Sequence, residues 1–171
     1  SYNGGSGFDT IDFSDAKQGM TIDLSKKVAD GQGHDTVWNF EQVIGSSFND
    51  SMKGSKVAET MVGGAGDDFL RGLGGADTLT GGEGRDTFAW LAKDVLDENG
   101  NHLGVDHITD FSADDALDFT KLLSGMDWNS IDEVVAVRDD GNSAHVYAML
   151  GQQWVEVAVL DGVQGMTASD M

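Results

Sequence analysis

The chain has 171 residues, with 24 glycines, no proline, no cysteine and a formal net charge of −20 at pH 7. The missing cysteines exclude disulfides and thiolate metal sites. The acidic excess excludes nucleic acid as a partner, because phosphate binding needs cationic side chains. No run approaches the ~18 apolar residues of a membrane-spanning helix.

Taken in chain order, the sequence is dominated by a nine-residue repeat. An isolated copy lies at residues 4–12, and a partial one at 30–37. Five copies then follow without a gap, at 45–53, 54–62, 63–71, 72–80 and 81–89. The shared pattern has glycines at positions one, two and four, an acid at position six and a large apolar residue at position eight. Because its period is fixed, this pattern predicts a solenoid.

The residue types within each unit predict its geometry. Glycine permits the positive φ angles of a tight turn, and the last three residues suit a very short strand. The residue at position eight should point inward, which applies to Ile11, Val37, Met52, Met61, Leu70, Leu79 and Phe88. Two units make one coil, so alternate units should stack. We expect Met52, Leu70 and Phe88 on one sheet, and Met61 and Leu79 on the other.

The acid at position six indicates a calcium ligand, because carboxylates provide the hard oxygen atoms that calcium prefers. Strands of three residues bury little apolar surface. Stacked carboxylates also repel one another. We therefore expect calcium to be part of the folded structure.

Beyond the repeats, residues 97–102 read as a surface loop. Strands expected at 133–138, 143–150 and 154–160 are joined by turns at 139–142 and 151–153, which predicts an antiparallel meander. Such an element would cap the open end of the solenoid.

The repeats resemble the RTX (repeats-in-toxin) family. The opening segments 4–14, 19–25 and 41–45 are similar to the irregular first coils of its domains. Segments 86–90, 106–111 and 116–119 resemble the closing segment of RTX proteases, alginate epimerase modules and large adhesins. The resemblance implies an all-β fold: a calcium-stapled parallel β-roll over residues 1–89, with an antiparallel β-rich C-terminal capping region over 90–171 packed as one unit with it.

The resemblance also implies the ligands, because each calcium of the family lies between two turns one coil apart. Carbonyls at positions two and four of one turn, carbonyls at positions one and three of the next, and both acids hold the ion. Carried over, Ser46, Phe48 and Asp50 face Gly63, Ala65 and Asp68; Gly64, Gly66 and Asp68 face Gly81, Glu83 and Asp86; and Ser55, Val57 and Glu59 face Gly72, Gly74 and Asp77. Glu59 in place of aspartate, and Phe48 and Val57 in place of glycine, predict weaker sites.

Two further sets extend this prediction to the ends of the repeats. We expect Gly5, Gly7 and Asp9 to share an ion with Asp30, Gln32 and Asp35 across a longer coil. Asp106 and Asp110 should close the last sites, near Asp77 and Asp86. Together these sites imply roughly four to seven calcium ions.

No hydrolase elbow, zinc-binding helix or phosphate loop is present, so we predict no catalytic activity. The family resemblance implies a module that folds on calcium outside a Gram-negative cell and supports type I secretion of a larger protein, a surface adhesin. Its partners would be calcium, the secretion channel during export, and a glycan or cell-surface target reached through the larger protein. The first residues already lie within a pattern, so we expect a longer parent chain.

Two alternatives share the same repeat. One is a polysaccharide-binding module, and the other is the C-terminal domain of a secreted enzyme such as an alginate epimerase, protease or lipase. A sugar-stacking platform would need exposed aromatic side chains. We expect core or cap packing instead for Trp38, Trp90, Trp128 and Trp154.

Overall fold

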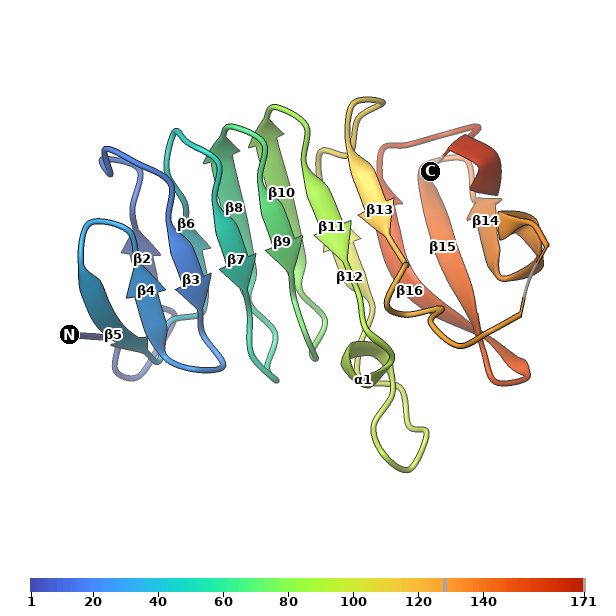
Figure 1. Cartoon of the computed structure of the whole chain (residues 1–171), viewed down its shortest axis with the longest axis horizontal. Helices are drawn as coiled ribbons and strands as arrows, with labels where there is room; N and C mark the ends of the chain where they lie inside the picture. The colour runs from blue at the N-terminus through green and yellow to red at the C-terminus, as the bar shows by residue number, and fades with distance from the viewer. Residues whose placement is uncertain (128, 171) are drawn as a thin grey trace.

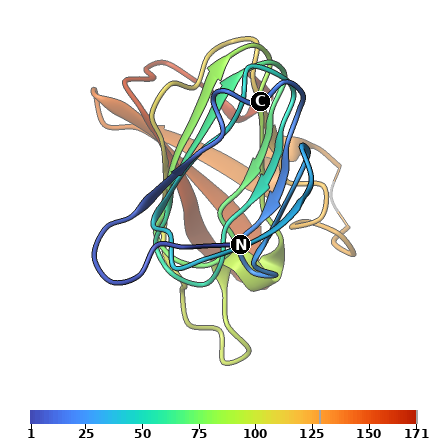
Figure 2. The same cartoon turned by 90° about the vertical axis from the view of Figure 1, so that its left-hand side faces the viewer.

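The computed structural model describes residues 1–127 and 129–170, which form two facing β-sheets of eight strands each. The coils lie side by side along the long axis, from the N-terminal hairpin to the C-terminal cap (Figure 1). Seen from the N-terminal end, the two sheets face each other across a narrow core (Figure 2). No described helix is long and apolar enough to cross a membrane.

The strand orders follow the alternation of the repeats between the sheets. The first sheet runs β1 (Tyr2–Asn3), β5 (His34–Trp38), β4 (Val28–Asp30), β3 (Thr21–Asp23), β7 (Ser51–Lys53), β9 (Phe69–Arg71), β11 (Thr87–Ala89), β13 (Ala116–Asp118). The second runs β14 (Val135–Asp139), β15 (Ser143–Leu150), β16 (Gln153–Asp161), β12 (Asp106–Ile108), β10 (Thr78–Glu83), β8 (Thr60–Ala65), β6 (Gln42–Ile44), β2 (Thr10–Asp12). Helical structure comprises α1 (Ala92–Val95) and 3-10 turns at Ile131–Glu133 and Ala168–Asp170.

The central strands pair in parallel at the predicted spacing. Thr78 of β10 lies opposite Thr60 of β8, and Thr87 of β11 lies opposite Phe69 of β9. Equivalent residues of neighbouring coils are thus 18 positions apart along the chain. This register confirms the parallel β-roll and its coil of two repeats.

The core is built from the residue at position eight of each unit. Met52, Leu70 and Phe88 are cross-strand neighbours in the first sheet, and Met61 and Leu79 in the second. All five are at most 1% exposed. Side chains alternate between the faces of a strand, so a strand of three residues sends only its middle side chain inward. The predicted stacks are therefore confirmed.

The roll continues beyond residue 89, where the sequence predicted its end. β12 pairs in parallel with β10, and β13 pairs in parallel with β11. Equivalent residues are here 29 positions apart rather than 18. The inserted segment 90–100, which contains α1, accounts for the difference. After it the count of nine resumes as units 101–109 and 110–118, with Ile108 and Leu117 buried at position eight.

The predicted meander is present as β14, β15 and β16, which pair antiparallel. Its last strand also pairs in parallel with β12 of the roll. The cap therefore extends the second sheet, and its backbone satisfies the edge that β12 would otherwise expose.

Candidate metal sites

Position six of the repeats places acids along both edges of the roll, where each turn enters its strand. Asp50, Asp68 and Asp86 lie on one edge, and Glu59 and Asp77 lie on the other. Each is at most 4% exposed. Buried carboxylates need hydrogen-bond donors or a cation to compensate for lost hydration.

Backbone amides provide part of that compensation. The carboxylate of Asp68 accepts a hydrogen bond from the amide of Asp50 at 2.7 Å, and that of Asp86 accepts one from the amide of Asp68 at 2.9 Å. On the other edge, Asp77 accepts from the amide of Glu59 at 2.8 Å. Each acid thus binds its equivalent one coil earlier, which produces a ladder along each edge.

Among the described residues, the second carboxylate oxygen of three of these acids has no hydrogen-bond donor. Oδ2 of Asp68, Asp77 and Asp86 is buried without a hydrogen-bond partner, and so is Oδ2 of Asp9. An unpaired buried charge of this kind is very unfavourable, and natural proteins pair it or use it to coordinate a metal. The four atoms therefore fit a cation held at the turns.

The pKa values of the buried aspartates show the same lack of compensation for their negative charge. Burial raises the pKa of Asp68 to about 7, with the neighbouring Asp50 and Asp86 carboxylates adding to the effect. Burial also raises the pKa of Asp77 to about 7, assisted by Asp106. The pKa of Asp86 is raised by burial as well. Low-dielectric surroundings disfavour the charged form, and a bound cation would restore it.

Glycine lets the turns stack closely enough to bring their carbonyls together. Gly64 has a φ of 117°, and a Cβ there would lie 2.1 Å from the carbonyl oxygen of Ser46. Gly82 has a φ of 105°, and its Cβ would lie 2.0 Å from the carbonyl oxygen of Gly64. Leu73 occupies the equivalent position of the intervening unit and has a φ of 77°. Only glycine adopts this backbone without strain.

The stacking juxtaposes the turns that the sequence paired: 45–50 with 63–68, 63–68 with 81–86, and 54–59 with 72–77. Amide-to-carbonyl hydrogen bonds join them, from Ala65 to Ser46, Gly66 to Glu83, and Gly74 to Ser55. Within the described residues no three His, Asp or Glu side chains converge into a metal-binding group. A cation between two turns would therefore be held by two carboxylates and by backbone oxygens.

Two acids are satisfied within their own turns. Glu59 accepts hydrogen bonds from the amide of Ser55 at 3.0 Å and from its hydroxyl. Asp50 accepts from the amide of Ser46 at 2.5 Å and from its hydroxyl at 2.8 Å. In both turns the serine at position two donates hydrogen bonds to the acid. Glycine or leucine stands at position two in the turns of Asp68, Asp77 and Asp86, and neither has a side-chain donor. The turns of Asp50 and Glu59 are weaker candidates than those of Asp68, Asp77 and Asp86.

The predicted arrangement of the opening coil is wrong. β1 runs parallel to β5, so the turn with Gly5, Gly7 and Asp9 stacks on the turn that follows β5. Asp9 donates its amide to Glu41 at 2.9 Å.

The other predicted ligands of this coil, Asp30, Gln32 and Asp35, lie towards the opposite end of β5, around its hairpin with β4. Asp35 lies 3.5 Å from the N-terminal amine. The antiparallel β3–β4–β5 segment reverses the chain, which a count of nine does not reveal. Glu41 could have been found, because residues 36–44 place it at position six and Val43 at position eight.

At the closing end Asp106 and Asp110 lie at the turns of Asp77 and Asp86, and a third acid joins them. Asp106 lies beside Asp77 and accepts a hydrogen bond from its amide at 3.1 Å. Asp110 accepts from the amides of Gly81 and Gly82 at 2.9 and 2.8 Å. The acid that accepts from the amide of Asp86 is Asp115, at 2.8 Å. Asp115 was missed, although it stands at position six of unit 110–118.

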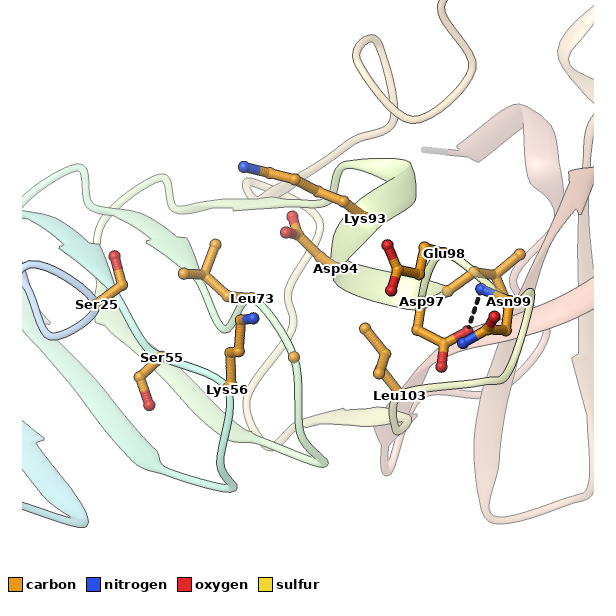
Figure 3. Close-up of a pocket in the computed structure, with 12 residues that line it drawn as sticks. Ser25, Ser55, Lys56, Leu73, Lys93, Asp94, Asp97, Glu98, Asn99 and Leu103 are labelled. Carbon is orange, nitrogen blue, oxygen red and sulfur yellow. Dashed lines mark hydrogen bonds between the residues drawn. The ribbon is translucent and has the colours of Figure 1, made fainter.

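A groove of about 710 Å³ lies between the turns of the roll and the inserted segment 90–100. Ser25, Ser55, Lys56 and Leu73 line it from the roll, and Leu103 lines it from the residues that follow the insertion (Figure 3). The insertion contributes Lys93, Asp94, Leu96, Asp97, Glu98 and Asn99. Asp94 anchors the insertion by a bidentate ion pair with Arg71, at 2.7 and 2.9 Å. The described lining residues include no aromatic side chain.

The tryptophans do not form one platform in the described structure. Trp90 is buried at 2% exposure, as expected for core packing, whereas Trp154 of β16 is 40% exposed. Trp38 of β5 is half-buried at the N-terminal end of the roll. Trp128 lies outside the described residues.

The comparison with protein-family models agrees with the nine-residue repeat. Residues 57–88 match the family model of the RTX calcium-binding nonapeptide repeat (4 copies). The solved structures include a similar chain, the AlgE6R3 subunit of the Azotobacter vinelandii mannuronan C5-epimerase, at 29% identity over 72% of this chain and 77% of that chain, with a TM-score of 0.32. A search of curated proteins found no match. The family match shows that residues 57–88 are RTX calcium-binding nonapeptide repeats, and the 18-residue register shows that these repeats are wound into a parallel β-roll.

Proposed function

We propose that this chain is a calcium-dependent folding module of a larger secreted protein. The observation that supports this most directly is the set of buried, donorless Oδ2 atoms on Asp68, Asp77 and Asp86. They recur at the period of the fold, so they belong to its construction and not to a single local site. We assign the module no catalytic role.

Asp68, Asp77 and Asp86, with backbone oxygens of the turns stacked on them, are the proposed ligands. When bound, calcium supplies the positive charge that the buried carboxylates lack. Four donorless oxygens, including that of Asp9, favour the lower end of the range of roughly four to seven ions. Asp50 and Glu59 would contribute less, because serine donors already satisfy them.

Because the buried carboxylates need calcium, folding would depend on whether the chain is in the cytosol or outside the cell. Metal-binding free energy becomes folding free energy when the site does not exist in the unfolded chain. At the low calcium of the cytosol, a chain of charge −20 with uncompensated buried acids would remain unfolded and able to pass a type I secretion channel. Extracellular calcium modules bind with dissociation constants of ~10⁻⁴–10⁻³ M. Folding outside would then favour outward export of the parent protein, which we propose to be a surface adhesin.

The first experiment is a calcium titration of EDTA-treated protein followed by far-UV circular dichroism, with magnesium as the control. We expect a cooperative gain of β-signal in calcium, at high-micromolar to millimolar concentration, and none in magnesium. A protein that is fully folded in EDTA and insensitive to calcium would disprove the folding role.

The export role needs a separate experiment, because folding on calcium does not by itself move a protein. Secretion of the intact parent protein would be measured as external calcium is varied. We expect export to fall as calcium is removed. Export that is independent of external calcium would refute this part of the proposal while leaving the folding role intact.

A further inference from the structure

Trp90 makes an unusual contact at the point where the repeat is interrupted. It follows β11 directly, and its indole Nε1–H donates a hydrogen bond to Oδ2 of Asp106 at 2.8 Å. Oδ1 of the same carboxylate accepts from the amide of Asp77 at 3.1 Å. Both oxygens of Asp106 therefore have protein donors.

The equivalent acids of the preceding units differ in this one respect. Asp68, Asp77 and Asp86 also accept an amide hydrogen bond on Oδ1, but their Oδ2 atoms have no donor. Asp106 is buried to the same degree, at 3% exposure. Asp106 therefore differs from the other three acids in having an indole donor to its Oδ2 atom, and not in its burial.

The sequence explains why a large side chain fits at residue 90 but not at the equivalent position of the preceding repeats. Counting in nines, Trp90 stands at position one, where the three preceding units have Gly63, Gly72 and Gly81. A Cβ on these glycines would lie 2.1–2.3 Å from Oδ2 of the acid in the same turn. The rest of the inserted segment 90–100 separates Trp90 from Asp106, the next acid of this ladder. This separation leaves room for the indole ring.

We propose that Trp90 closes the acid ladder of this edge in place of a cation, because its indole N–H occupies the side of Asp106 that the earlier acids leave free for calcium. This inference rests on the proposed calcium-binding function, and it removes Asp106 from the calcium ligands that the family resemblance implied. The last ion on this edge would then be held at Asp77, between its turn and that of Glu59.

The closure also joins the ladder to the cap. The Trp90 ring stacks on Phe119, with centroids 5.3 Å apart and planes at 18°. The backbone amide of Trp90 donates to the carbonyl of Asp118 at 3.3 Å. One residue, Trp90, thus connects the last acid of one edge to Asp118 and Phe119 at the end of the last coil.

A matched pair of variants tests the proposal. The number of calcium ions per molecule would be measured by elemental analysis after equilibrium dialysis, for Asp77→Asn, Asp106→Asn and the unaltered protein. We expect Asp77→Asn to lose at least one ion and Asp106→Asn to keep the full number. A loss in Asp106→Asn equal to that in Asp77→Asn would overturn the proposal. Failure of the unaltered protein to bind calcium would instead disprove the proposed function.

A second measurement needs no folded Asp106 variant. In ¹⁵N-tryptophan-labelled, calcium-loaded protein, the Trp90 indole signal would be assigned by its loss in Trp90→Phe. We expect its proton to exchange at least ~10-fold more slowly than that of the exposed Trp154, because it is buried and hydrogen-bonded. Exchange as fast as that of Trp154 would overturn the proposal.

Discussion

The amide of Asp68 donates a hydrogen bond to Asp86 at 2.9 Å, yet the second carboxylate oxygen of Asp86 is buried without any donor. The two residues are 18 positions apart and occupy the same place in successive coils of one edge. The contact that fixes the register of the roll thus leaves one carboxylate oxygen without a donor at Asp68, Asp77 and Asp86.

The first prediction compares two neighbouring aspartates of one turn. Asp68→Asn removes a buried carboxylate, and we expect it to raise the calcium concentration at the folding midpoint by roughly tenfold, equivalent to about 1.4 kcal/mol. Asp67→Asn is the control, because the Asp67 side chain is 45% exposed and, within the described residues, pairs with Arg85 alone. We expect it to shift the midpoint by less than about twofold. Equal shifts in the two variants would argue against a ligand role for Asp68.

The second prediction concerns pH in the absence of calcium. The pKa values of Asp68 and Asp77 are about 7 in the folded state, against about 3.9 in an unfolded chain. Below the lower value both states hold the proton. Between the two values the unfolded state loses its proton first, so the stability of the calcium-free fold falls as pH rises and becomes constant above about 7.

Far-UV circular dichroism of the protein in EDTA at several pH values would measure this dependence, because the folded fraction should rise as pH falls from about 7 towards 4. The Asp77→Asn variant provides the control, because it lacks one of the groups that titrate and should show a shallower decline. A calcium-free stability that is constant from about pH 4 to 7 would contradict the raised pKa values. In calcium, we expect the opposite trend, with affinity falling on acidification below about 7, because protons compete with the cation.

The third prediction separates backbone strain from stacking. Gly82 and Gly5 have nearly the same φ, 105° and 106°, but a Cβ at Gly82 would lie 2.0 Å from a backbone oxygen, whereas one at Gly5 would meet nothing within 4 Å. We expect Gly82→Ala to cost about 1–3 kcal/mol more than Gly5→Ala, since the turns must separate. Thermal unfolding in saturating calcium would measure both variants. Equal costs would show that stacking at Gly82 tolerates a side chain.

The fourth prediction concerns the core. Leu79 is 1% exposed and stacks on Met61, so Leu79→Ala should cost about 2–5 kcal/mol through lost burial and a cavity. Val57 is 62% exposed, and Val57→Ala should stay within about 0.5 kcal/mol of the unaltered protein. Urea denaturation in saturating calcium would compare them. A small effect at Leu79 would mean that the single inward side chain of each strand contributes little.

The sequence by itself determined the local construction of this protein. A period of nine predicted the coil, the inward stacks of Leu70 and Leu79, and the position of Asp68 and Asp77 in the stacked turns. These features repeat within one or two units of the chain, and the turn chemistry of glycine and aspartate decides them locally.

Only the tertiary structure decided which acids meet at the two ends of the roll. Asp9 lies beside Glu41 because an antiparallel hairpin reverses the chain between them. Asp86 meets Asp115, and Trp90 reaches Asp106, because the segment 90–100 leaves the coil and the count of nine then resumes. The nine-residue period is the same before and after each of these two segments, so it does not reveal which turns meet. That is decided by which strand edge the chain pairs with when it returns to the roll.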